Sequence, residues 1–122
     1  MIRLAVPALL LAAAPAIAQD AAPAEGPAAP LSMQQQAALK CSAAFALGAA
    51  EQAQGRNKAW PLLAERGKEF FVRSSAAIMD ETGWTRDQVA DELTAQARDL
   101  RRPGALEAAM QPCLLLLDAS GL

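Results

Sequence analysis

Residues 32–55, SMQQQAALKCSAAFALGAAEQAQG, decide the fold class of this chain. Ser32 is a good N-cap residue, and Gln35 three positions later completes a capping box. Small or apolar side chains then recur at spacings of three and four, at Ala37, Cys41, Ala44, Phe45 and Gly48. Gly55 suits the position just after a helix end. The stretch therefore predicts a helix from about Met33 to Gln54.

A second helix is expected to follow a short loop. Pro61 suits a first helical turn, where its missing N–H costs nothing, and the pattern continues to about Glu81, before Gly83. The side chains expected on one face are Leu63, Gly67, Phe70, Phe71, Ser74, Ala77 and Ile78. Because the loop is short, the first two helices should form an antiparallel hairpin.

The third helix has the clearest start. Thr85 and Gln88 form a second capping box, and Trp84 and Val89 can close a hydrophobic staple around it. A narrow apolar stripe follows, at Val89, Leu93, Ala97 and Leu100. The proline and glycine at 103–104 end this helix.

The last segment, residues 105–119, predicts one helix or two. Leu106 and Met110 should point inward, and Gly121 ends the pattern. Pro112 forces either a kink or a fresh start, because the residue before a proline avoids the helical region. Alanine, the best helix former, supplies 31 of the 122 residues, and β-branched residues are scarce. The predicted fold is an all-α bundle of four helices, or five if Pro112 splits the last.

Chain arithmetic pairs residues across the predicted hairpin. Gly48 and Gly67 are equidistant from the middle of the loop, and so are Phe45 and Phe70. Two glycines meeting at a helix crossing would let the backbones approach closely, flanked by stacked rings. The alternative is that each glycine is merely tolerated, at a cost of about 1 kcal/mol relative to alanine.

The first eighteen residues have the pattern of a secretory signal peptide. Arg3 supplies positive charge, an apolar stretch spans residues 4–14, and small residues precede a cleavage site between Ala18 and Gln19. The apolar stretch is much shorter than the roughly 20 residues that span a bilayer, so no transmembrane segment is expected after cleavage. The expected destination is the bacterial periplasm or the exterior.

Residues 19–31 hold three prolines and a glycine and show no apolar periodicity. Such a segment cannot bury enough surface to offset its ordering entropy, so the prediction is a disordered linker rich in alanine and proline. The helical domain is then expected to span residues 32–122.

Cys41 and Cys113 lie in the first and last predicted helices. In an oxidising compartment an even pair of cysteines usually forms a disulfide, and a bridge this long would stabilise the domain by roughly 4 kcal/mol. A reactive pair is the alternative, although redox-active cysteines usually lie two residues apart beside a helix N-terminus. Pro112 keeps that alternative open, because it could place Cys113 near such a terminus.

Four consecutive leucines make the last helix apolar around most of its circumference, at Leu114, Leu115, Leu116 and Leu117. Such a helix must be central to the bundle or must bury its outer face against a partner. The central position is preferred, because burial in the core is the commoner fate of such runs. The alternatives are a homodimer contact and a ligand groove, so the run is a candidate partner surface.

The composition excludes several kinds of chemistry. The chain has no histidine, and two cysteines alone cannot hold zinc or an iron–sulfur cluster. A net charge of −2 gives no electrostatic reason to bind nucleic acid. No phosphate-binding loop, haem motif or nucleophile elbow is present, so neither a cofactor nor a metal is expected.

The remaining charged residues suggest solvated helix ends rather than a catalytic centre. The densest acids fall around one helix–helix turn, at Asp80, Glu81, Asp87, Asp91 and Glu92. Arg66, Lys68 and Arg73 give the second helix a modest basic edge.

The expected function is that of a non-enzymatic periplasmic binding protein, which acts on a protein partner or client as an adaptor, an inhibitor or a stress-protective chaperone. One alternative is an enzyme or enzyme subunit that uses Asp80, Glu81, Asp87 and Arg101. Another is a structural protein of the cell envelope, whose linker would reach a partner in the membrane or the wall.

Overall fold

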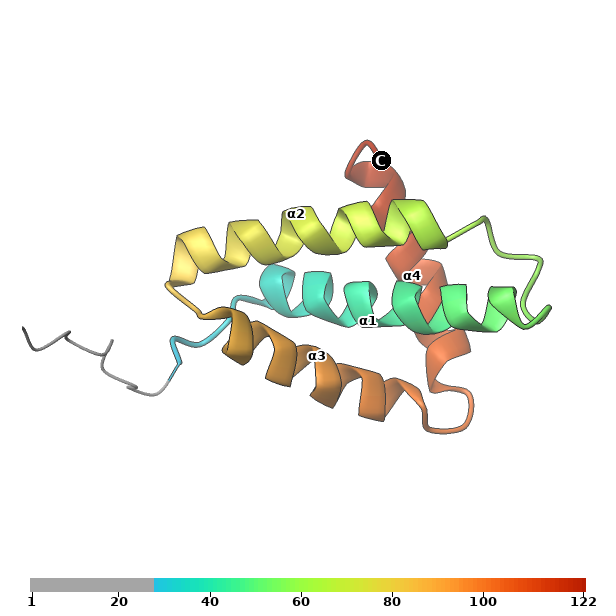
Figure 1. Ribbon diagram of the computed structural model, residues 1–122, viewed down its shortest axis with the longest axis horizontal. Coiled ribbons are helices and arrows are strands. Elements are labelled where there is room, and N and C mark those ends of the chain that lie inside the picture. Colours follow the sequence, from blue (N-terminus) through green and yellow to red (C-terminus); the bar gives the residue numbers. More distant parts are fainter. Residues whose placement is uncertain (1–27) are drawn as a thin grey trace, which may run out of the picture.

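Four helices account for most of the chain that the structure describes. This computed structural model describes residues 28–122 and contains no strand there. The helices are α1 (Met33–Ala53), α2 (Ala64–Thr82), α3 (Arg86–Leu100) and α4 (Ala105–Ala119) (Figure 1). The predicted all-α class is confirmed. The predicted signal peptide and residues 19–27 of the predicted linker lie outside the described residues.

Both predicted capping boxes are present, and they determine where α1 and α3 begin. The Ser32 hydroxyl accepts a hydrogen bond from the backbone N–H of Gln35, whose side chain accepts one from the Ser32 N–H. Thr85 and Gln88 make the same pair of bonds at α3. Each box satisfies two backbone donors that would otherwise lack a partner.

The start of α2 differs from the prediction, because the helix begins at Ala64 and Pro61 lies outside it. The reason is a side chain of α1. The amide nitrogen of Gln52 donates to the carbonyl of Pro61 at 2.9 Å, and its oxygen accepts from the backbone N–H of Leu63 at 3.1 Å. These bonds hold residues 61–63 against α1 as a loop, and Leu63 is fully buried there.

The last helix is continuous, so the five-helix alternative is wrong. Pro112 lies inside α4, which runs unbroken from Ala105 to Ala119. Proline has no N–H to donate to the carbonyl of Ala108 one turn earlier. Both residues are exposed, so water can reach that carbonyl.

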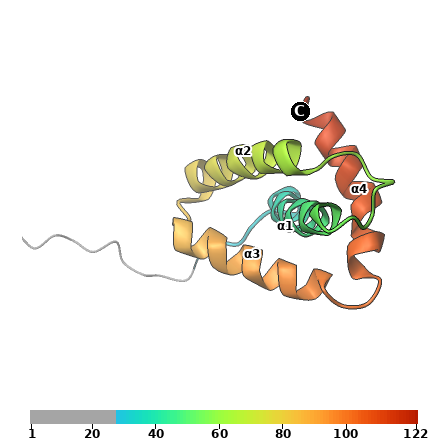
Figure 2. The ribbon, with the colours of Figure 1, turned by 45° about the vertical axis from the view of Figure 1, so that its right-hand side comes forward.

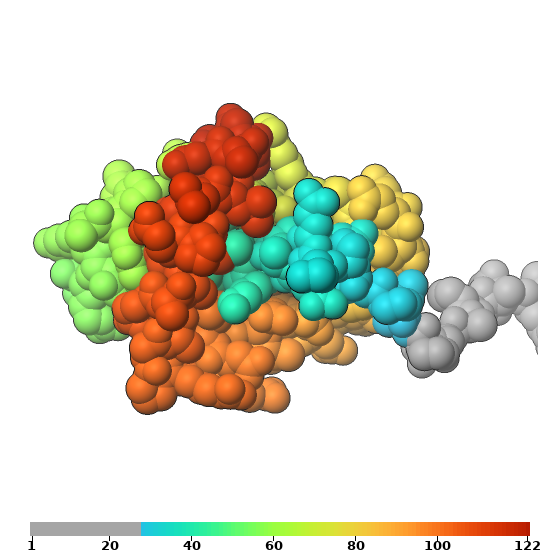
Figure 3. Space-filling model, turned by 180° about the vertical axis from the view of Figure 1, so that it is seen from behind, coloured from blue at the N-terminus to red at the C-terminus, as the bar shows by residue number. Residues whose placement is uncertain are grey.

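The central helix is α1, not the helix with the leucine run. Each of the other three helices packs mainly on α1 and makes few contacts with the other two. Figure 2 shows α1 between α2 and α3, with α4 crossing beside them. Seen from behind, α4 lies across the molecule with α1 beside it (Figure 3). Small side chains explain the position of α1, because they let three helices approach it; its buried residues are Leu39, Cys41, Ser42, Ala43, Ala44, Phe45 and Gly48.

The hairpin of α1 and α2 packs through its predicted aromatic pair. The rings of Phe45 and Phe70 lie 5.3 Å apart in an edge-to-face arrangement. Gly48 and Gly67 do not pack on each other, although their equal distances from the loop suggested that they would. A Cβ on Gly67 would lie 2.7 Å from the Cβ of Phe45, and one on Gly48 would lie 2.7 Å from Leu63 Cδ1. Gly67 on α2 therefore makes room for Phe45 of α1, and Gly48 on α1 makes room for Leu63 of the loop before α2.

The predicted disulfide is confirmed. The sulfur atoms of Cys41 and Cys113 are 2.09 Å apart, and the Cα atoms are 5.1 Å apart. Both cysteines are buried in the main core, so the bridge joins α1 to α4 inside the domain. A smaller core of Leu39, Ile78 and Val89 lies apart from it, with Trp84 packed alongside.

Candidate functional site

A groove lies between α2 and α3. It encloses about 600 Å³ and is lined by residues of α1, α2 and α3. It exists because α2 and α3 each pack on α1 and scarcely touch each other. In Figure 1, α1 runs between these two helices and α4 lies behind them.

The floor of the groove is a stripe of small side chains on α1. Ala43, Ala46 and Ala50 follow at spacings of three and four, with Leu47 beside them. Ala46 and Ala50 are exposed, although they belong to the central helix of the domain. The floor is therefore shallow, apolar and open to an occupant.

One side chain from α2 and three from α3 form most of the walls. On α2, Phe71 stands at the groove and is 36% exposed. The sequence places it on the packed face with Phe70, which is buried, so the expectation for Phe71 is wrong. On α3, Leu93 and Ala97 form the opposite wall together with the methyl-bearing Thr94. The apolar part of both walls faces the alanine floor.

The charges that line the groove are both positive. Lys68 comes from the α2 wall and Arg101 from the end of the α3 wall, and no acidic residue is part of the lining. None of the ion pairs found among residues 28–122 involves either cation. The groove therefore combines an apolar floor with a cation on each wall.

A second hollow of about 360 Å³ adjoins the groove. The two share Leu47, Ala50 and Arg101. The second is more polar and carries three arginines, Arg56, Arg101 and Arg102, against two glutamates, Glu51 and Glu107. Arg102 is already paired with Asp99 at 2.8 Å, and Glu51 accepts a hydrogen bond from Asn57. The apolar groove thus leads into a hollow in which Arg56 and Arg101 make no ion pair.

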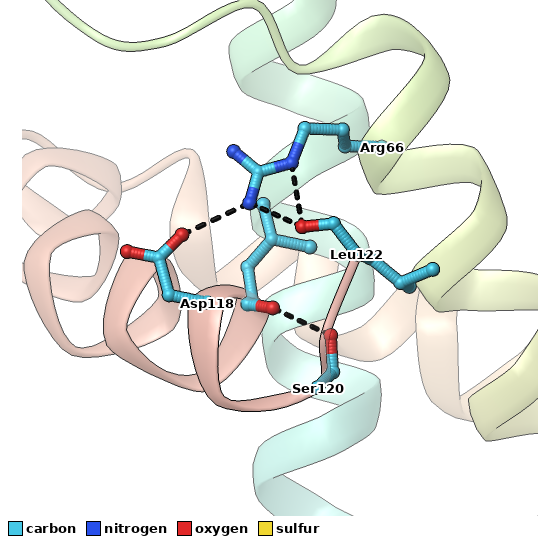
Figure 4. Close-up of polar contacts among 5 residues, drawn as sticks. Arg66, Asp118, Ser120 and Leu122 are labelled. Carbon is cyan, nitrogen blue, oxygen red and sulfur yellow. Dashed lines mark hydrogen bonds and ion pairs between the residues drawn. The ribbon is translucent and has the colours of Figure 1, made fainter.

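The three residues of the predicted basic edge of α2 differ in their partners. Arg66 donates to Asp118 at 2.9 Å and to the main-chain oxygen of Leu122, and so ties α2 to the end of α4 (Figure 4). Arg73 pairs with Glu69 along α2. Only Lys68 of the three faces the groove.

The four leucines are separated by the helix into different environments. Leu117 is fully buried, Leu114 and Leu116 are half-buried against the main core, and Leu115 is 64% exposed. Leu117 is therefore a core residue, and the part of this run that a partner could reach is centred on Leu115. None of the four lines the groove.

The acids and the arginine of the enzyme alternative do not line a common hollow among those found in residues 28–122. Asp80, Glu81 and Asp87 are exposed, and Arg101 lines the groove. Glu81 lies instead beside a small hollow of about 220 Å³, where it accepts a hydrogen bond from Gln35 at 2.8 Å. Within residues 28–122, no cluster of acids and cysteines could hold a metal ion, and no helix has the length and apolar character to cross a membrane.

The sequence pattern did not predict the groove, although the spacing of alanines on α1 indicates part of it. The spacing of Ala43, Ala46 and Ala50 marks a second face of α1, distinct from the predicted stripe that contains Cys41 and Phe45. Alanine fits a core and an exposed helix face equally well, so the pattern alone could not show that this face lacks a covering helix. Comparison of the chain with models of protein families, with curated proteins and with solved structures found no match.

Proposed function

We propose that this chain is an exported, non-enzymatic binding protein and that the groove between α2 and α3 is its binding surface. The observation that carries the proposal is the open apolar floor of the groove on the central helix. Small domains usually cover such surfaces, and a concave apolar hollow with a few polar groups at its rim is the usual form of a binding site.

The location in the proposal is the periplasm or the exterior of a bacterial cell. A buried disulfide between α1 and α4 supports an oxidising compartment. The charge, apolar stretch and small residues of positions 1–18 support export with cleavage after Ala18.

Binding rather than catalysis is supported by the make-up of the groove. Its ionisable groups are Lys68 and Arg101, and it holds no acid that could exchange a proton with either. General acid–base chemistry usually needs a group that can change charge near the working pH, and the chain has no histidine. The arrangement of the groove suits recognition of apolar surface and negative charge.

The test uses an apolar fluorescent dye, anilinonaphthalene sulfonate, and a variant that fills the groove. Ala46→Trp adds a large ring to the exposed floor without displacing a core residue. Ala108→Trp is the matched control, because Ala108 is exposed on α4 and lines none of the hollows described above. We expect saturable dye binding to the native chain and the control, with at least about tenfold weaker binding to Ala46→Trp.

Circular dichroism and thiol titration should show that all three proteins keep their helices and their disulfide. Equal dye binding by Ala46→Trp and Ala108→Trp, or no saturable binding by the native chain, would remove the groove as the binding surface.

A further inference from the structure

We infer that the groove binds one amphipathic helix of a partner protein, with its apolar face on α1 and acidic side chains at its flanks. The inference rests on the proposed function and adds the class of ligand. It is carried by the arrangement of the helices, by the dimensions of the floor and by the charges of the walls.

The helix arrangement leaves a place for one more helix. α1, α2 and α3 lie side by side, whereas α4 crosses on the opposite face and is tied there by the disulfide (Figures 1 and 3). The position above α1 and between α2 and α3 is therefore vacant. Alanine floors allow close approach of helices, whose axes pack about 8–10 Å apart. A helix in this position would bury the exposed Ala46 and Ala50.

The dimensions of the floor set the length of the segment bound. The axial distance from Ala43 to Ala50 on α1 is about 10 Å, and that from Leu93 to Arg101 on α3 is about 12 Å, at 1.5 Å per residue. These distances match about two turns of helix. The ligand then presents apolar side chains at positions i, i+3, i+4 and i+7, as in other complexes of a helix in a groove.

The charges of the walls select an acidic helix. Lys68 lies on α2 and Arg101 at the end of α3, and no acid among residues 28–122 lines the groove. A helix lying between them can offer a carboxylate to each wall from its two flanks. An anionic single-chain lipid has its charge at one end, whereas the two cations of the groove come from different walls. Arg56, in the adjoining hollow, adds positive charge beyond the end of the α3 wall.

The test uses three fluorescein-labelled peptides of fourteen residues. The first has leucines at i, i+3, i+4 and i+7 with glutamates at the flanks. The second has lysine in place of each glutamate, and the third is the first peptide with a central proline that breaks the helix. Fluorescence anisotropy gives each dissociation constant. We expect the glutamate peptide to bind at least about tenfold more tightly than either of the others.

Variants of the protein assign the binding to the groove. Ala46→Trp should weaken binding of the glutamate peptide at least about tenfold, and Ala108→Trp should leave it unchanged. The double variant Lys68→Glu with Arg101→Glu should reverse the preference, so that the lysine peptide binds more tightly. A preference that this double variant leaves unchanged contradicts the assigned role of the two walls.

Two further outcomes overturn the inference while leaving the proposed function intact. The first is dye binding that Ala46→Trp abolishes, with no binding of any peptide. The second is displacement of the dye by laurate and not by the glutamate peptide, which would identify the ligand as a lipid. Failure of dye binding itself overturns both proposals.

Discussion

Gly67 illustrates how a single residue sets the distance between two helices. The position that its Cβ would take lies 2.7 Å from the Cβ of Phe45 and 3.8 Å from its Cα. The Cβ of Phe45 is fixed by the backbone of α1, so rotation of the phenylalanine side chain cannot move it away. Gly48 differs, because the atoms that its Cβ would meet are the mobile ends of Leu63 and Met110. Two glycines on one hairpin thus differ in how much a methyl group would disturb.

We expect Gly67→Ala to lower the free energy of unfolding by about 1–3 kcal/mol, even after the gain in helix propensity. Gly48→Ala is the matched comparison and should cost less, since side-chain ends can shift. Urea denaturation of the two variants measures the difference. Equal losses, or a stable Gly67→Ala protein, would contradict the close approach at Phe45.

Ser75 carries a second prediction at the residue scale. Its hydroxyl is buried in α2 and has no hydrogen-bond partner, whereas the buried hydroxyl of Ser42 donates to the carbonyl of Ala38 at 2.8 Å. We expect Ser75→Ala to raise the free energy of unfolding by about 1 kcal/mol, because it removes an unpaired buried polar group. Ser42→Ala, which removes a paired group, should give no such gain in the same denaturation experiment.

At the scale of the element, α4 is the helix whose position depends most on specific links. It crosses the back of the bundle rather than running beside its neighbours (Figure 3). Cys113 ties its middle to α1, and the ion pair of Asp118 with Arg66 ties its end to α2 (Figure 4). The ion pair is partly exposed and contributes little. Of these two links, the disulfide therefore contributes more to holding α4 in this orientation.

Reduction of the disulfide should lower the free energy of unfolding by about 4 kcal/mol, because the unfolded chain regains the freedom of a loop closed by residues 72 positions apart. Denaturation with and without a reductant measures the loss. The double variant Cys41→Ala with Cys113→Ala is the control, and its stability should not respond to reductant. A native protein equally stable in both conditions would show that the bridge is dispensable.

Pro112 gives a prediction for the helix itself. Pro112→Ala restores an N–H donor to the carbonyl of Ala108 and removes the ring from the interior of α4. Because Pro112 is exposed, the change leaves the core intact. We expect the free energy of unfolding to rise by about 1–2 kcal/mol. Proline in a helix destabilises the folded state by more than it stabilises the protein through restricting the unfolded chain. Thermal denaturation should show a higher midpoint than that of Gln111→Ala, an exposed neighbour.

At the scale of the whole molecule, the packing around one central helix explains both the stability and the groove. α1 is covered by α4 on one face and flanked by α2 and α3, which leaves one stripe of alanines open between them. The N-terminal end of the described chain is attached to this body, because the indole N–H of Trp84 donates to the carbonyl of Ala29 at 2.7 Å. Ala29 thus lies at the end of the bundle where α2 meets α3.

The proposed export leads to a prediction for the whole chain. Protein recovered from the medium or the periplasm of an expressing bacterium should begin at Gln19, because signal peptidase cleaves after small residues such as Ala18. Intact mass measurement gives the mature N-terminus. Ala18→Arg should block cleavage and leave the longer chain, whereas Gln19→Ser should be cleaved normally. A mature chain that retains residues 1–18 in the native case would contradict the predicted signal peptide.

Several features of the fold were predictable because they depend on residues close together in the sequence. The capping boxes at Ser32 and Thr85 are local hydrogen-bond patterns, so they locate helix starts without knowledge of the fold. The start of α2 was not predictable in this way, because the bonds that hold Pro61 outside the helix come from Gln52 on another element. The disulfide was predictable from the cysteine count together with the predicted signal peptide.

The sequence by itself determined the helical class, the aromatic pair of the hairpin and the pairing of Cys41 with Cys113. It also determined the number of helices, except for whether Pro112 divides the last one. Only the tertiary structure decided that α1 is central, that Leu117 is buried while Leu115 is exposed, and that Ala46 faces an open groove. The physical reason is that periodicity shows which side chains share a helix face. Which faces are covered depends on the crossing angles of helices distant in sequence, and side-chain packing sets those angles.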